Sequence, residues 1–193
     1  MASLRHSKFA SLHDVELCSH AALGERAAFG ELVRRHGSAV RGVLRRMGAP
    51  PAEADDVAQD AFLTAFERIA EFRGEGTFAA WVKKIAARLY LRRLARERKL
   101  GVLTAEAAED EPPPRADADA TIDLDGALKT LGATERLCVT MCFGAGLSHT
   151  EAAEALNLPL GTVKSHVKRG LDKLRARLAP ESGAVVEGRS GHG

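Results

Sequence analysis

An acidic, proline-rich segment near the middle of the sequence divides the chain into two parts. The stretch 106–114 holds four acidic residues followed by three consecutive prolines. Such a composition buries too little apolar surface to offset the entropy lost on ordering, so it predicts a flexible tether. The predicted organisation is a flexible tail at 1–13, a first domain at 14–99, an acidic linker at 100–121, a second domain at 122–179 and a disordered tail at 180–193.

Both predicted domains show the periodicity of amphipathic helices. Val57, Ala61 and Ala65 step by four in the first domain, and Val163 and Val167 do so in the second. Aromatic residues make up only 5% of the chain, and alternating runs of Val, Ile and Thr are missing. We therefore predict an all-α chain of two small helical domains joined by a flexible acidic linker. Helices are expected at about 25–47 (interrupted at Gly37), 52–70, 77–99, 134–143, 148–156 and 161–178, with a short one at 14–18. Ser11, Thr77 and Thr134 are the predicted N-caps of the helices that follow them.

Charge is strongly segregated although the net charge is only +2. Residues 83–99 hold eight basic residues and one acidic residue, and 162–177 hold six basic residues and one acidic residue. Residues 104–125, by contrast, hold eight acidic residues and one basic residue. Two basic blocks around an acidic one indicate two contacts with a polyanion. The alternative is that these blocks are solvated helix faces.

Several classes of site and segment are not indicated by the sequence. The three cysteines form no CxxC or Cys/His set, so we expect no metal and no other cofactor. Cys138 and Cys142, four residues apart, are interpreted as core packing rather than a redox pair, and fit a reducing compartment. No apolar run has the length of a membrane span, and no signal peptide is predicted.

Residues 147–177 have the proportions of a helix-turn-helix: a short helix, a tight turn and a longer basic helix. Ser148 and Glu151 predict a capping box at the start of the first helix. The major groove admits one helix, whose first turns usually meet the bases while later cations hold phosphates. The expected DNA-contacting residues are Thr162, Lys164, Ser165, His166, Lys168 and Arg169. A generic amphipathic hairpin remains the alternative.

Two separate sets of motifs resemble one family. The stretch 146–156 (GLSHTEAAEAL), followed by 160–166 (LGTVKSH), resembles the C-terminal DNA-reading domain of bacterial sigma factors, and GTVKS is characteristic of the extracytoplasmic-function (ECF) group. The stretch 54–62 (ADDVAQDAF) is similar to that family's polymerase-binding helix. The stretch 72–82 (FRGEGTFAAWV) resembles its segment that melts and reads the −10 promoter element. Both sets occur in the family's order.

The resemblance implies a sigma factor that binds core RNA polymerase, directs promoter-specific initiation, acts in the cytoplasm at the nucleoid and is regulated by an anti-sigma factor. It implies no enzymatic activity and no small-molecule substrate. The implied core-binding residues are Asp55, Asp56, Gln59 and Asp60. The implied −10 residues are Arg73, Phe78, Lys84, Arg88 and Arg92, while the helix-turn-helix would read the −35 element.

The chain departs from the family's pattern on the helix that follows Trp81. An Asn is expected where Arg88 stands and an Asp where Arg92 stands, so this surface is more cationic than usual. Trp81 itself heads an apolar stripe with Ile85 and Leu89, and is interpreted as a core residue rather than a platform for a base.

Two other function classes compete with the sigma-factor interpretation. An autonomous helix-turn-helix regulator would bind DNA without polymerase, but it leaves the acidic helix around Asp55–Asp60 unexplained. A helical enzyme would need a nucleophile–base pair, a phosphate loop or a metal-ligand set, and the sequence offers none of these.

Overall fold

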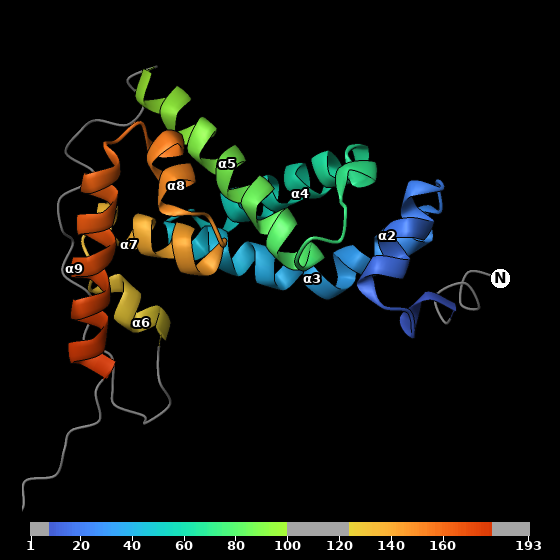
Figure 1. Cartoon of the computed structure of the whole chain (residues 1–193), viewed down its shortest axis with the longest axis horizontal. Helices are drawn as coiled ribbons and strands as arrows, with labels where there is room; N and C mark the ends of the chain where they lie inside the picture. Colours follow the sequence, from blue (N-terminus) through green and yellow to red (C-terminus); the bar gives the residue numbers. More distant parts are fainter. Residues whose placement is uncertain (1–7, 100–123, 179–193) are drawn as a thin grey trace, which may run out of the picture.

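The first half of the chain is helical throughout the part that the structure describes, apart from short connections and a 3₁₀ turn. The computed structural model describes residues 8–99 and 124–178. In the first of these ranges the elements are α2 (Asp14–Ala22), α3 (Arg26–Met47), α4 (Pro51–Glu67), η1 (Ile69–Glu71) and α5 (Phe78–Lys99). Figure 1 shows α3 running along the base of this unit, with α4 and α5 above it.

The second half is a smaller helical unit that ends in a long helix. Its elements are α6 (Leu124–Lys129), α7 (Ala133–Val139), the π-helical turn η3 (Thr140–Gly144), α8 (His149–Leu156) and α9 (Leu160–Leu178). No strand occurs within the two described ranges, so the predicted all-α class is confirmed. The predicted linker and the predicted tail at 180–193 lie outside the described residues. The predicted tail at 1–13 is described from residue 8 onward, and there it is not loose: residues 8–10 are helical and Phe9, 4% exposed, belongs to the main core.

Local sequence explains where most of these helices begin and end. Pro51 occupies the first position of α4, where the missing N–H has no partner to lose. Thr77 caps α5, as predicted, because its Oγ1 accepts a hydrogen bond from the Ala80 N–H at 3.1 Å. Helix α3 ends at Gly48, whose φ of 108° is costly for any residue with a Cβ.

Three of the predicted boundaries were wrong. Helix α3 continues through Gly37 without a break, because nine buried residues along its length outweigh the weak helix propensity of one glycine. The cap of α2 is His13 with Glu16, not Ser11. Helix α7 starts at Ala133 after Gly132, so Thr134 lies inside the helix rather than at its cap.

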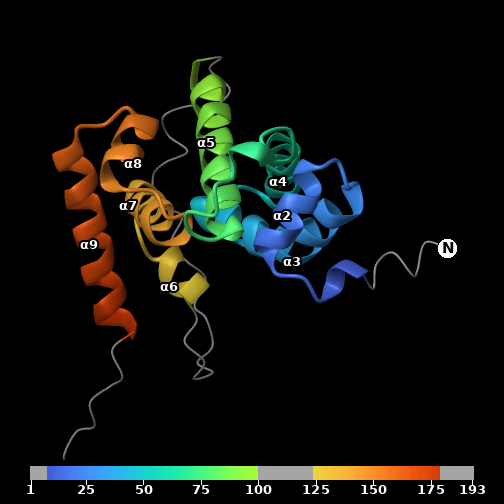
Figure 2. The same cartoon turned by 45° about the vertical axis from the view of Figure 1, so that its right-hand side comes forward.

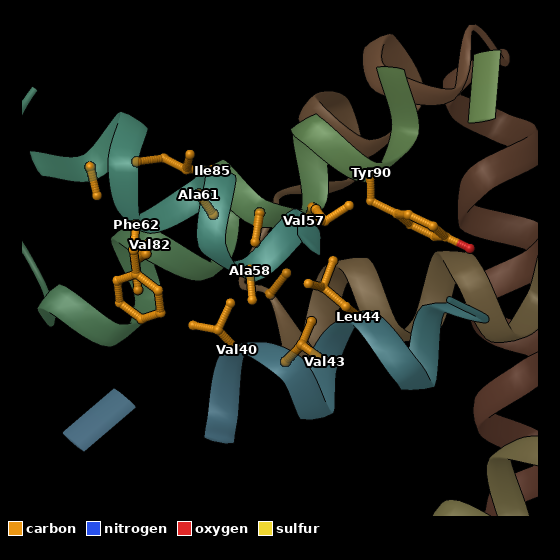
Figure 3. Close-up of a cluster of buried hydrophobic side chains, with 14 of the residues drawn as sticks. Val40, Val43, Leu44, Val57, Ala58, Ala61, Phe62, Val82, Ile85 and Tyr90 are labelled. Carbon is orange, nitrogen blue, oxygen red and sulfur yellow. The ribbon is translucent and has the colours of Figure 1, made fainter. Parts of the chain in front are cut away.

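Helices α3, α4 and α5 enclose the main hydrophobic core. Figure 3 shows Val40 and Leu44 of α3 facing Val57 and Ala61 of α4, with Val82 of α5 beside them. All of these side chains are 2% exposed or less. Small alanines on the buried side of α4 let α5 approach closely, and this close packing directs the polar faces of both helices outward.

The two halves of the chain share this core rather than packing separately. One continuous cluster joins buried side chains of α3 and α5 with Cys138, Met141 and Leu147 of the second half. Helix α3 contacts α7 and η3, and α5 contacts α8. Figure 2 shows α7 and α8 lying between α9 and the first unit. The periodicity in the sequence predicted the apolar faces, but not that the two units would bury theirs against each other.

Gly170 allows α9 to pack closely against α7. A Cβ at this position would lie only 2.7 Å from Val139 Cγ2 and 3.5 Å from Leu131 Cδ1. Glu135 of α7 is 9% exposed and pairs with two cations of α9, Lys173 at 2.7 Å and Arg169 at 3.6 Å. Helix α9 is therefore held against α7 by both a close apolar contact and a pair of salt bridges.

Gly170→Ala should destabilise the protein because the added methyl group overlaps Val139. We expect the free energy of unfolding to fall by about 1–2 kcal/mol, the overpacking cost less the gain in helix propensity. Urea unfolding measures the change. Gly30→Ala is the matched control, because Gly30 is a helical glycine of α3 with nothing within 4 Å of an added Cβ. A Gly170→Ala variant as stable as Gly30→Ala would contradict this packing.

A buried carboxylate ties α2 to α3. Glu31 has a 5% exposed side chain and accepts hydrogen bonds from Arg34 and Arg35, the shortest at 2.7 Å. Arg35 also pairs with Asp14 at 3.1 Å, and His36 lies 2.7 Å from the same carboxylate. The hydrogen bonds from Arg34 and Arg35 lower the pKa of Glu31 to about 2.

This lowered pKa predicts acid sensitivity with a definite sign. The carboxylate titrates near 4.5 in the unfolded chain and near 2 in the folded one, so its stabilising effect is complete above pH 4.5 and is lost as the pH falls towards 2. Glu31→Gln should flatten the fall in unfolding free energy across that window in urea titrations. Glu67→Gln, at an exposed position of α4, should keep the wild-type acid dependence. Equal acid dependence in both variants would remove Glu31 as the cause.

Candidate polymerase and promoter interfaces

Helix α4 presents an acidic edge beside an apolar groove. The predicted polymerase-binding residues Asp55, Asp56, Gln59 and Asp60 are all exposed on this helix. Asp55 lies 3.5 Å from Arg41 of α3, and the other three have no partner among the residues that the structure describes.

The groove itself lies between α3 and α4 and encloses about 540 Å³. Phe29, Phe62, Leu63 and Phe66 provide much of its apolar lining, and Gln59 lies at its edge. Leu63 is 56% exposed, which is unusual for a large apolar side chain and marks a surface able to receive a partner. The sequence analysis missed Leu63, although it stands out as an apolar residue on the otherwise polar side of this helix.

The loop before α5 leads into a cluster of aromatic rings. The ring centroids of Phe72, Phe78 and Trp81 are 5.5 to 5.9 Å apart. Phe78 is only 1% exposed, so its ring is a core residue and the predicted direct contact with DNA does not fit its position. Trp81 is partly buried at the rim of the core, and Arg73 is exposed in the loop. Of these two rings, which lie three positions apart on α5, Phe78 is therefore the more deeply buried, whereas the sequence suggested Trp81.

The predicted cationic stripe of α5 is present. Arg88 and Arg92 are exposed, and Lys84 is partly exposed. Lys84 and Arg88 both reach the second half of the chain, where Glu151 lies 3.5 Å from Lys84 Nζ and 2.9 Å from Arg88 Nη2. Arg92 has no acidic partner among residues 8–99 and 124–178.

Helices α8 and α9 form the predicted helix-turn-helix. Ser148 Oγ accepts a hydrogen bond from the Glu151 N–H at 3.1 Å, while Glu151 Oε2 accepts one from the Ser148 N–H at 2.8 Å. This confirms the capping box at the start of α8. Asn157 ends α8 in the left-handed region, with φ of 52°, and so turns the chain into α9. Val163 and Val167 of α9 are buried against α8 and the shared core.

The polar face of α9 carries the six predicted DNA-contacting residues. Lys164, Ser165, Lys168 and Arg169 are exposed, and Thr162 and His166 are partly exposed. Ser165 donates its hydroxyl to the Gly161 carbonyl at 2.9 Å, and Arg169 lies 3.1 Å from His166. Lys164 and Lys168 pair with no acidic side chain in the described part of the chain. They are therefore the cations of this face that are free to meet phosphates.

Comparisons with known proteins match both halves of the chain. The family model described as "Sigma-70 region 2" matches residues 32–100, and "Sigma-70, region 4" matches residues 127–176. RNA polymerase sigma factor CnrH of Cupriavidus metallidurans is 33% identical over 180 residues, covering 86% of this chain and 94% of that protein. ECF RNA polymerase sigma factor SigE of Mycolicibacterium smegmatis is 32% identical over 180 residues, covering 86% of this chain and 68% of that protein.

The chain belongs to the extracytoplasmic-function RNA polymerase sigma factors. A solved structure, CnrH in complex with the cytosolic domain of CnrY, resembles it with a TM-score of 0.50 and 29% identity, covering 88% of this chain and 99% of that one. As a sigma factor, the protein directs promoter-specific initiation by RNA polymerase. The alternative of a regulator that acts without polymerase is therefore set aside.

The two matched regions separate the candidate surfaces of this sigma factor. Region 2 contains the acidic edge of α4 and the cationic stripe of α5, and region 4 contains α8 and α9.

Burial raises the pKa of Cys138 to about 11 and also raises the pKa of Cys142, so both thiols are protonated near neutral pH. This agrees with the core-packing interpretation of the pair.

The described ranges contain neither a candidate metal site nor a helix able to span a membrane. Residues 8–99 and 124–178 contain no group of three or more His, Cys, Asp or Glu side chains placed to hold a metal ion. No helix in those ranges combines the length and the hydropathy needed to cross a bilayer.

Proposed function

We propose that this sigma factor uses three separate helical surfaces for its three partners in initiation. The acidic edge of α4 and its apolar groove bind core RNA polymerase. The cationic stripe of α5, with the loop around Arg73, engages the −10 element, and the polar face of α9 reads the −35 element. The proposal rests mainly on α4, which combines unpaired carboxylates with an exposed apolar groove. Such a surface suits a protein partner, because DNA would favour neither feature.

The physical character of each surface supports its assignment. A partner helix with apolar and basic side chains would bury Leu63 and Phe66 while pairing with Asp56 and Asp60. The cations of α5 and α9 suit phosphates instead, and the first turns of α9 suit base edges. The rings of Phe72 and Trp81, at the two ends of the loop, are partly exposed, so they replace Phe78 as the candidates for contact with an unpaired base.

The proposal extends to regulation and to the site of action. CnrH was solved with the cytosolic domain of another protein, CnrY, and we propose that this sigma factor is likewise held inactive by an anti-sigma factor. We also propose that it acts in the cytoplasm at the nucleoid. It would contribute promoter recognition rather than catalysis, since the polymerase synthesises the RNA.

Reversing two carboxylates of α4 should abolish binding to core polymerase while sparing the fold. Asp56→Lys/Asp60→Lys places two cations against a polymerase surface that would be complementary to the wild-type carboxylates. The affinity for core should therefore fall at least about tenfold. Fluorescence anisotropy with purified core measures the affinity, run-off transcription measures the activity and circular dichroism checks the fold.

The matched control is Glu154→Lys/Asp172→Lys, which reverses two exposed carboxylates on α8 and α9 and should retain core binding. Unchanged core affinity in Asp56→Lys/Asp60→Lys would remove α4 from the interface. A wild-type protein that neither binds core nor starts RNA from any template would overturn the proposed function itself.

Removing the two unpaired cations of α9 should weaken promoter recognition without affecting core binding. Lys164→Ala/Lys168→Ala should lower the slope of log affinity against log salt by about one, because Lys168 is the expected phosphate contact and each such contact contributes about 0.9, while Lys164 lies in the first turns that meet base edges. Titration of −35 duplex DNA with the polymerase holoenzyme gives the slope. Arg175→Ala/Arg177→Ala, which removes two exposed charges near the end of α9, should change it by less than half as much. Loss of core binding together with DNA binding would argue against separate surfaces.

A further inference from the structure

A cavity of about 420 Å³ lies where the end of α3 meets α6 and α7. Its volume is within the range of about 300–1,000 Å³ that is typical of small-molecule sites. Ala49, Pro51 and Leu128 form part of its wall. One acid, Asp125, faces four bases in the lining, which are Arg45, Arg46, Lys129 and Arg136. The cavity is therefore strongly cationic, and it lies outside the surfaces assigned above to polymerase and promoter.

Three of the four bases have no acceptor. Arg46 is neutralised, because its Nε lies 2.6 Å from Asp125 Oδ1. Within residues 8–99 and 124–178, the side chains of Arg45, Lys129 and Arg136 make no hydrogen bond and no salt bridge. Three positive charges around this cavity thus remain uncompensated by the protein.

Arg136 gives the strongest indication of a missing ligand. It is partly buried on α7, and its Nε is shielded from solvent with no hydrogen-bond partner in the described part of the chain. Its Nη2 would lie 3.4 Å from a Cβ at Gly48, so the guanidinium is held against the end of α3. A shielded cation without an acceptor is costly. An anion in the cavity would accept from the Nη groups of this guanidinium and supply the missing charge.

Helix dipoles alone explain these cations less well. Arg45, Lys129 and Arg136 lie in the last turns of α3, α6 and α7, where a partial charge of about −0.5 at each helix end favours a cation. Side chains in that role hydrogen-bond the last carbonyls of the helix, and none of these three does so in the described ranges. The three partial charges also offset only about half of the unpaired positive charge.

The arrangement suits an anion with several charges. Guanidinium groups bind phosphate oxygens through paired hydrogen bonds, and a lysine binds them as a point charge. One carboxylate would neutralise a single cation. A phosphate group carries a charge of about −1.5 to −2 at neutral pH, so two linked phosphates carry enough charge for all three cations.

We propose that this cavity binds a small molecule that carries a diphosphate group, either inorganic pyrophosphate or a nucleotide. Arg136 holds the phosphates at the buried side of the cavity, while the exposed side chains of Arg45 and Lys129 hold them at its rim. The wall formed by Ala49, Pro51 and Leu128 provides apolar surface for an organic group. The site is independent of the proposed function, because it uses none of the residues assigned to polymerase or promoter.

Calorimetric titration of the full-length chain with pyrophosphate tests the site directly. In magnesium-free buffer of constant ionic strength, the wild type should bind pyrophosphate at least about tenfold more tightly than sulfate. Arg45→Gln/Lys129→Gln should weaken pyrophosphate binding at least about tenfold, since it removes two charge-assisted contacts. The matched control is Arg26→Gln/Lys164→Gln, which removes one exposed Arg and one exposed Lys near the starts of α3 and α9. The control should bind pyrophosphate like the wild type.

Thermal unfolding separates ligand binding by Arg136 from a structural role. Without ligand, Arg136→Gln should unfold at a temperature no lower than that of the wild type, because its guanidinium has no partner to lose. Pyrophosphate should raise the unfolding temperature of the wild type but not that of Arg136→Gln. A lower unfolding temperature without ligand, together with an unchanged pyrophosphate shift, would contradict the proposal.

Two further ligands distinguish the sources of the diphosphate. Tighter binding of adenosine diphosphate than of pyrophosphate would assign the cavity to a nucleotide, and equal or weaker binding would assign it to the inorganic ion. Adenosine, which lacks phosphate, should bind in neither case.

Three results would overturn the proposal. The wild type could bind pyrophosphate no more tightly than sulfate, or Arg45→Gln/Lys129→Gln could bind it as tightly as Arg26→Gln/Lys164→Gln. In the third, Arg45→Gln/Lys129→Gln loses affinity for a short DNA duplex while the wild type does not bind pyrophosphate, which would make the cavity a DNA contact. Failure of the proposed function would appear separately, as a wild-type chain that binds pyrophosphate but not core polymerase.

Discussion

The shared burial of apolar faces against α3 is the interaction on which the rest of the structure depends. This helix contacts α2, α4 and α5 on the region 2 side and α7 and η3 on the region 4 side. Its fully buried residues, including Leu32, Val40 and Leu44, lie on successive turns. Because α3 cannot shift without exposing these residues, it fixes both the angle of α4 and α5 and the surface against which the second half packs. The acidic edge and the cationic stripe are consequences of this single scaffold.

The periodic features of the fold were predictable from the sequence. Helical class, the N-cap at Thr77, the capping box at Ser148, and the outward direction of the α5 and α9 cations follow from residue types at fixed spacing. Helix ends were less predictable, because tertiary packing carried α3 through Gly37. The position of Phe78 was also misjudged. Trp81 packs against the core as predicted but stays partly exposed, whereas Phe78, three residues earlier on α5, is buried against Phe29.

What the sequence could not reveal is how the two halves meet. A pattern of apolar residues indicates that a helix face is buried, but it does not identify the face that covers it. The contact of Glu151 with Lys84 and Arg88 spans more than sixty positions, and the need for a glycine at 170 depends on the distance to Val139. The resemblance to the family identified the candidate site residues, but it did not indicate that Lys84 and Arg88 would pair with an acid of the other half.

The interface between the two halves combines weak polar contacts with a stronger apolar one. Partly exposed salt bridges stabilise a contact by only about 0–1 kcal/mol each, and salt weakens them. The bridges from Lys84 and Arg88 to Glu151 are of this kind, so they orient α8 on α5 more than they stabilise the contact. The buried side chains of Cys138, Met141 and Leu147 contribute most of the free energy, because each removes apolar surface from water.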